Sequence, residues 1–255
     1  MQTPAYMARA FEVASIIETS LAKHALLMPL LQRFPRDMTK LTSYGFEIPI
    51  ITQVNLSIRS AANYLCVLSG ARHSAMAALN LDRDRRLFGL LHIGPPASVI
   101  LIDADLSTYV INYVIAHELG HFFGDLLLVR QQWLTQLPEQ HEEIQKAFEW
   151  QPHNGLLDLQ AFLHGLPPRP RPILARGQGE LLETEARERQ ADLVARELLA
   201  PWRIVEPLAP QCNRNEIALA LHHEFGLPKY IARDYADDIR YACEPPRSLV
   251  DRLFK

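Results

Sequence analysis

Cysteine is scarce in this sequence, and its arrangement argues against two common kinds of site. The three cysteines, Cys66, Cys212 and Cys243, are odd in number and share no C-x-x-C spacing. A disulfide framework needs paired cysteines, and a cysteine zinc site needs them at short, fixed spacings. Neither follows from this pattern, which fits a protein of the reducing cytosol.

The sequence also lacks long apolar runs and any strong excess of charge of one sign. No segment approaches the roughly 18 apolar residues that a membrane span requires. The N-terminus shows no charged start, uninterrupted apolar stretch or small-residue cleavage site of a signal peptide. A formal net charge of -3 gives no basic footprint for nucleic acid or an anionic membrane. We therefore expect a cytoplasmic protein that binds neither a membrane nor nucleic acid directly.

Apolar periodicity and turn residues predict an α+β protein that is mainly helical. Two short apolar runs, Leu87 to Ile93 and Val99 to Ile102, flank a Gly-Pro-Pro turn and predict two strands of a small sheet. Residues 44–58 contain Gly45, Pro49 and several β-branched residues, and they receive no assignment. The helical predictions are 11–21, 26–31, 60–79, 109–123, 131–150, 181–200, 215–225 and 228–241.

The chain is long enough for one large domain, or for a catalytic domain with a small appendage. We divide it into a helical region of unknown role at 1–80, a core at 81–205 with a long insert at about 124–180, and a C-terminal helical appendage at 206–255. The appendage resembles a helix-turn-helix pair. Between Asn213 and Arg240 its four basic and five acidic residues make a poor duplex binder, so we expect it to pack against the core.

The strongest motif is His117-Glu118-Leu119-Gly120-His121, which matches the H-E-x-x-H pattern in full. Four residues apart on a helix, the two histidines project from one face, about one turn apart. The polar triplet interrupts an otherwise apolar helix, where burial is costly unless such groups are paired or bind a metal. Catalytic zinc needs two or three fixed ligands, an open position for water and a nearby base. We therefore predict a zinc centre with His117 and His121 as ligands and Glu118 as the catalytic general base.

A third ligand has to come from elsewhere, and helix 181–200 carries carboxylates on its apolar stripe. Steps of three and four residues place Glu185, Glu188 and Asp192 among alanine, valine and leucine positions. We predict Glu188 as the third ligand, with Glu185 and Glu183 as the competing ligands. The positions that face away from the stripe are Arg187, Gln190 and Glu197.

Two further residues are expected to support this pairing of helices. Asp192 lies one turn after the predicted ligand and can accept a hydrogen bond from the free ring nitrogen of His117 or His121. Gly120 costs about 1 kcal/mol of helix propensity relative to alanine, so its presence predicts the close approach of another backbone. Ala191 is small in the same way and fits such a contact.

Two blocks together resemble the ImmA/IrrE family of metallopeptidases. They are INYVIAHELGHFF (residues 111–123), which follows a strand-like VILID, and ERQADLVARELLAP (residues 188–201). The tail segment IALALHHEFGLPKYIARDYADDI is also similar, so the resemblance covers about 87–127 and 180–242. It implies a zincin-like, gluzincin-like metallopeptidase domain in which His117, His121 and Glu188 hold zinc and Glu118 is the base. It further implies an intracellular protease that cleaves a helix-turn-helix repressor or an antitoxin-like regulator.

A zinc peptidase usually needs one more group to stabilise the developing oxyanion. The candidates in the tail are His222, His223, Tyr230 and Tyr235. The histidines of the insert, which we interpret as solvated, are His141, His153 and His164.

We predict a zinc-dependent endopeptidase that acts on a regulatory protein such as a transcriptional repressor. Two other classes stay open, namely a metal-dependent amidase acting on a small molecule and a non-catalytic partner-binding protein with structural zinc. Glu118 argues against the second, because a structural site needs no free base. Extended peptides bind such sites by pairing with a sheet edge, and Val99 to Ile102 is the expected edge strand.

Overall fold

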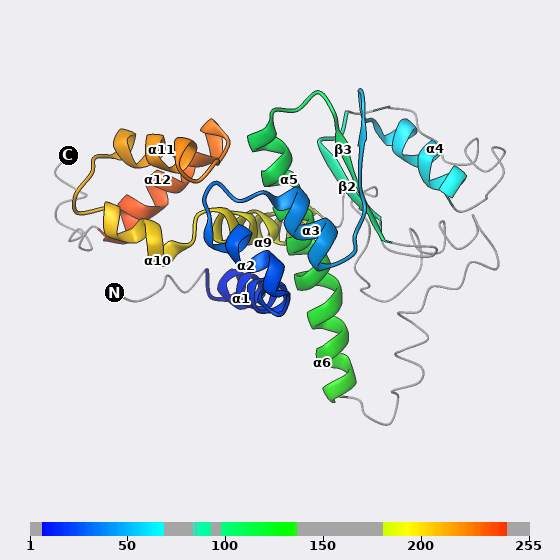
Figure 1. The fold of residues 1–255 in the computed structure, drawn as a ribbon, viewed down its shortest axis with the longest axis horizontal. Coiled ribbons are helices and arrows are strands. Elements are labelled where there is room, and N and C mark those ends of the chain that lie inside the picture. Colours follow the sequence, from blue (N-terminus) through cyan, green and yellow to red (C-terminus); the bar gives the residue numbers. More distant parts are fainter. Residues whose placement is uncertain (1–6, 69–83, 85, 93–97, 137–180, 244–255) are drawn as a thin grey trace.

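The computed structural model describes residues 7–68, 84, 86–92, 98–136 and 181–243 (Figure 1). Most of these residues are helical, and three short strands form one small sheet, so the fold is α+β as expected. The helices predicted at 60–79 and 131–150 run beyond the described ranges. Most of the predicted insert, with the three histidines interpreted as solvated (His141, His153 and His164), lies outside the described residues.

The bounds of the elements agree closely with the sequence pattern where both exist. The strands are β1 (Ile50–Gln53), β2 (Gly89–His92) and β3 (Val99–Asp103). The helices up to residue 68 are α1 (Ala8–Ala22), η2 (Ala25–Leu27), α2 (Met28–Gln32), α3 (Met38–Gly45) and α4 (Ile58–Leu68). The later helices are α5 (Thr108–His121), η4 (Phe122–Leu127), α6 (Leu128–Gln136), α9 (Leu181–Leu199), α10 (Trp202–Val205), η8 (Glu206–Leu208), α11 (Arg214–His223) and α12 (Lys229–Cys243).

The sheet has the order β1-β3-β2, which corrects the expectation that the strand at Val99 to Ile102 lies at its edge. β3 pairs in parallel with β1 and antiparallel with β2, and all five of its residues are buried. A continuous apolar strand that is buried on both faces belongs in the middle of a sheet. Within the described part of the chain, the edge strands are therefore β2 and β1. β1 comes from the stretch to which the sequence pattern gave no assignment.

Helix α5 lies between the sheet and α9, packing against β2 and β3 as well as against α9 (Figure 1). The two helices approach each other closely at Gly120, where an added Cβ would lie 3.0 Å from the Cα of Ala191. The close backbone approach predicted at Gly120 is thus confirmed. On the other side, an added Cβ at Gly89 would lie 2.3 Å from Cγ1 of Val114, so a glycine also brings β2 close to α5.

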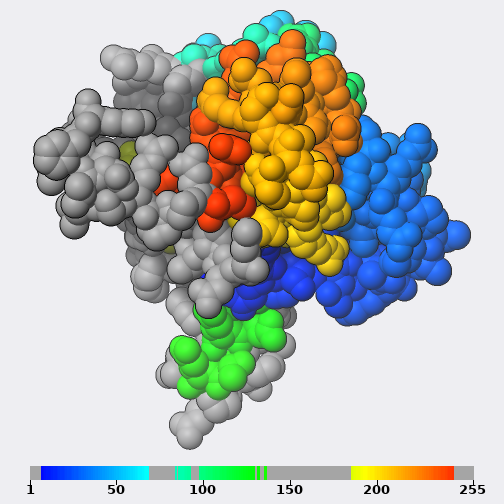
Figure 2. Space-filling model, turned by 90° about the vertical axis from the view of Figure 1, so that its left-hand side faces the viewer, coloured from blue at the N-terminus to red at the C-terminus, as the bar shows by residue number. Residues whose placement is uncertain are grey.

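The C-terminal helices α11 and α12 contribute buried residues to the main hydrophobic core, and α12 contacts α9 through an ion pair. Arg196 of α9 pairs with Asp238 of α12 at 2.8 Å. Asn213 begins α11 with a capping box, and Gly226 makes the turn between α11 and α12 at a φ of 76°. Figure 2 shows these helices, in yellow to red, gathered on one face, while α6, in green, projects from the body.

Among the described helices, none has the length and apolar character needed to cross a membrane.

Candidate metal centre

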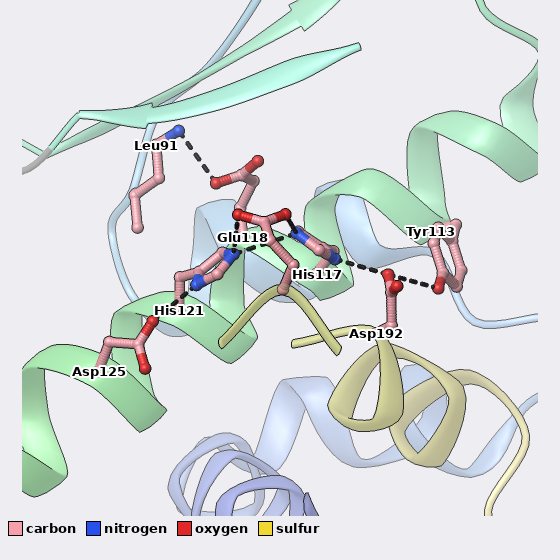
Figure 3. Close-up of polar contacts among 8 residues, drawn as sticks. Leu91, Tyr113, His117, Glu118, His121, Asp125 and Asp192 are labelled. Atoms are coloured by element: carbon pink, nitrogen blue, oxygen red, sulfur yellow. Dashed lines mark hydrogen bonds and ion pairs between the residues drawn. The ribbon is translucent and has the colours of Figure 1, made fainter. Parts of the chain in front are cut away.

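Helix α5 brings its two predicted histidine ligands together at its C-terminal end (Figure 3). Their Nε2 atoms lie 3.1 Å apart, and the ring planes meet edge to face at 75°. The side chains of His117 and His121 are 14% and 11% exposed, so the pair is largely shielded but reachable. One helical turn therefore aims two imidazole nitrogens at a single point, as the i,i+4 spacing predicts.

Glu188 of α9 completes the group from the facing helix. Its Oε2 lies 3.4 Å from Nε2 of His117, and its Oε1 lies 3.7 Å from Nε2 of His121. The three donor atoms all lie within 4.8 Å of one another, a group that could hold a metal ion. The competing Glu185 is exposed, and the side chain of Glu183 lies outside the described residues.

Each histidine is oriented by a carboxylate on its other ring nitrogen. Nδ1 of His117 lies 2.9 Å from Oδ1 of Asp192, and Nδ1 of His121 lies 2.7 Å from Oδ2 of Asp125. Such contacts fix the tautomer and turn Nε2 toward the metal position. Of the two partners left open for Asp192, the structure therefore selects His117.

Charge in the site strongly favours the protonated form of His117 when no metal competes for it. Burial lowers the pKa of His117, but its hydrogen bonds with Asp192 and Glu188 outweigh burial and raise that pKa to about 10. For Asp192, burial acts to raise the pKa, yet the contact with His117 brings it below its ordinary value. The donor set is thus anionic enough to stabilise a cation at this position.

Glu118 lies on the sheet side of the group and is 3% exposed. Its Oε2 accepts a hydrogen bond of 3.1 Å from the backbone N–H of Leu91 in β2 (Figure 3). Burial raises the pKa of Glu118, while the charges of His117 and His121 oppose this effect. Glu118 is therefore held by the sheet and lies outside the group of three candidate ligands.

No family model, curated protein or solved structure matches this chain.

Two residues of the site, Tyr113 and Asp125, were not predicted from the sequence, although their spacing from the two histidines is regular. Tyr113 donates its hydroxyl to Oδ1 of Asp192 at 2.8 Å, and Asp125 holds His121. Residues 113, 117, 121 and 125 follow one another in steps of four, which places them on one face of a helix. Extending the H-E-x-x-H spacing by one step in each direction would have found both.

The four candidates for oxyanion stabilisation occupy different surroundings. Tyr235 is fully buried and donates its hydroxyl to the carbonyl oxygen of Ala200 at 3.2 Å. Nδ1 of His222 lies 2.7 Å from the carbonyl oxygen of Leu227, and the His222 ring packs against Tyr109 and His223. Tyr230 is 52% exposed; burial of its hydroxyl end and the charge of Asp192 raise its pKa. Tyr230 is therefore linked electrostatically to Asp192, the residue that orients His117.

Proposed function

We propose that this chain is a zinc-dependent endopeptidase that cleaves a regulatory protein. The observation that carries the proposal is the convergence of two imidazole nitrogens and the Glu188 carboxylate beside the buried Glu118. A structural metal site would need four closed ligands and no neighbouring base, whereas a catalytic site keeps a position open. Three candidate ligands and one separate carboxylate fit the catalytic pattern.

The donor set and its spacing suit zinc. Two nitrogens bound to a tetrahedral zinc ion at roughly 2.0–2.1 Å would lie roughly 3.3–3.4 Å apart. The Nε2 atoms of His117 and His121 are 3.1 Å apart, and the carboxylate oxygens of Glu188 approach them at 3.4 and 3.7 Å. When bound there, zinc supplies Lewis acidity to the reacting carbonyl group and to the attacking water.

Glu118 supplies the proton transfer in this proposal. Its carboxylate takes a proton from the attacking water and passes it to the amine that leaves when the peptide bond breaks. The N–H of Leu91 holds one carboxylate oxygen at 3.1 Å and so fixes the direction of the other. Tyr230, whose pKa the charge of Asp192 helps to raise, is the favoured group to donate a hydrogen bond to the developing oxyanion.

In this proposal, an extended peptide binds at the edge of the sheet next to this group. β2 is an edge strand, and it approaches α5 closely enough for Leu91 to reach Glu118. Peptides commonly add to such an edge through main-chain hydrogen bonds. We therefore assign substrate binding to β2, in place of the strand at Val99 to Ile102. The resemblance of residues 111–123 and 188–201 to the ImmA/IrrE family supports a helix-turn-helix repressor or antitoxin-like regulator as substrate.

Co-expression tests this function directly. Each regulator encoded near this gene would be produced with the wild-type chain, with Glu118→Gln and with Glu185→Gln, and the products measured by mass spectrometry. We expect one cut in an exposed linker with the wild-type and Glu185→Gln chains, and none with Glu118→Gln. Glu185 is an exposed carboxylate near Glu188 on the same helix, so it is a matched control. Intact regulators together with hydrolysis of a small amide would favour the amidase class instead.

A further inference from the structure

Asp192 orients His117, yet it is poorly placed to hold its own position. Its side chain is 41% exposed at the surface of α9, and it contacts the ring of His117 across the interface between two helices. A carboxylate that is partly open to water can exchange its partners for water and sample several rotamers. Something else has to hold Asp192 if it is to fix the ring of a ligand.

Tyr113 provides that restraint. Tyr113 is 5% exposed, and its hydroxyl donates to the same oxygen, Oδ1 of Asp192, that Nδ1 of His117 contacts. The tyrosine and the histidine come from one helix, α5, whereas the aspartate comes from α9. Two groups that are fixed to α5 therefore hold one oxygen of α9 at 2.8 and 2.9 Å (Figure 3).

The other histidine has a simpler arrangement. His121 and Asp125 lie four residues apart along the continuous helical segment formed by α5 and η4, so their contact depends on no second helix. The side chain of Asp125 is also less exposed, at 23%. Of these two contacts, the one between His117 and Asp192 joins two helices, and it is this contact that the buried Tyr113 supports.

We propose that Tyr113 is a positioning residue of the metal centre, which acts on His117 through Asp192. The inference rests on the proposed metal-binding function, because it assigns Tyr113 a role in metal affinity. Tyr113 touches neither the metal position nor a substrate. Its hydroxyl keeps Oδ1 of Asp192 in line with Nδ1 of His117, and this keeps Nε2 of His117 directed at His121 and Glu188.

Zinc affinity of Tyr113→Phe tests the proposal without any substrate. Phenylalanine keeps the packing and removes only the hydroxyl, and circular dichroism would check that the fold is retained. Loss of an outer partner of a metal ligand typically weakens metal binding by roughly 10- to 100-fold. We expect that range for Asp192→Ala and a smaller loss, on the order of 3- to 10-fold, for Tyr113→Phe. Competition with a chromophoric chelator would give both dissociation constants.

Two controls separate positioning from a merely structural effect. Tyr235→Phe removes another buried hydroxyl, the one donated to Ala200, and should leave zinc affinity unchanged. In the Asp192→Ala background, Tyr113→Phe should cause no further loss, because the residue through which it acts is absent. The absorption spectrum of bound Co²⁺ should change with Tyr113→Phe but not with Tyr235→Phe.

The outcomes distinguish this inference from the proposed function. If the wild-type chain binds no zinc, the proposed function and the inference both fail. If the wild-type chain binds zinc and Tyr113→Phe binds it equally tightly, only the inference is overturned. A full loss caused by Tyr113→Phe in the Asp192→Ala background would also overturn it, because Tyr113 would then act by another route.

Discussion

Replacing Gly120 by alanine should disturb the metal centre without changing any ligand. Gly120 lies between the two histidines on α5 and faces α9. An added Cβ would lie 3.0 Å from the Cα of Ala191, 3.2 Å from its carbonyl oxygen and 3.2 Å from the Cβ of Val194. Backbone atoms cannot rotate away, so α5 and α9 must separate by a few tenths of an ångström.

Two opposing effects decide how Gly120→Ala changes the free energy of unfolding. Alanine gains about 1 kcal/mol over glycine in helix propensity, whereas overpacking a close contact costs roughly 1–3 kcal/mol. Gly124 is the matched control on the same continuous helical segment, because its added Cβ would meet only Cγ2 of Val13, at an ordinary 3.6 Å. The free energy of unfolding of Gly120→Ala should therefore fall below that of Gly124→Ala by about 1–3 kcal/mol in urea titrations.

Metal binding is the second readout of the same change. Glu188 lies three residues before Ala191 on α9, so a shift of α9 moves its carboxylate away from both histidines. Zinc affinity should fall by roughly tenfold in Gly120→Ala, a loss comparable to that of an outer partner of a ligand, and stay unchanged in Gly124→Ala. Equal stability and equal zinc affinity in the two variants would refute the claim that the contact between α5 and α9 sets the geometry of the centre.

Two further predictions concern single carboxylates. Burial raises the pKa of Glu197 from its ordinary 4.5 to about 8, so folding favours the protonated form. The stability that this group contributes is fully present below about pH 4.5 and is lost as pH rises toward about 8, by on the order of 1 kcal/mol per pH unit. Urea unfolding at pH 5 to 8 should show this decline relative to Glu197→Gln, and parallel profiles would contradict it. Asp125→Ala should weaken zinc binding by roughly 10- to 100-fold, because His121 loses the partner of its Nδ1; unchanged affinity in a chelator competition would exclude that role.

The sequence was most informative where local periodicity and chemistry agreed. Helical spacing predicted 109–123 and 181–200, close to the observed α5 and α9, and turn residues predicted the two antiparallel strands. The choice of Glu188 over Glu185 followed from the apolar stripe, and the exposure of Glu185 agrees with it. These features depend on residues near one another in the chain, so a local pattern contains them.

Features that depend on distant parts of the chain were missed. The central place of β3 requires pairing with β1, about fifty residues earlier, which no local pattern encodes. Glu197 was expected to face away from the core, yet it is 9% exposed because its carboxylate accepts the N–H of Trp202, where α10 begins. That hydrogen bond exists only after the chain turns at Pro201, so the helical wheel of α9 alone gave the wrong side.

The most direct test of the proposed metal centre is the metal content of protein that is freshly purified without any chelator. Elemental analysis should give about one zinc ion per chain for the wild-type protein and for Glu118→Gln, since Glu118 is not a ligand. His117→Ala and His121→Ala should each abolish that zinc, because each removes one of the two nitrogens that meet at 3.1 Å. The absence of any transition metal from the wild-type protein, or full zinc content in the histidine variants, would contradict the metal centre on which the proposed function depends.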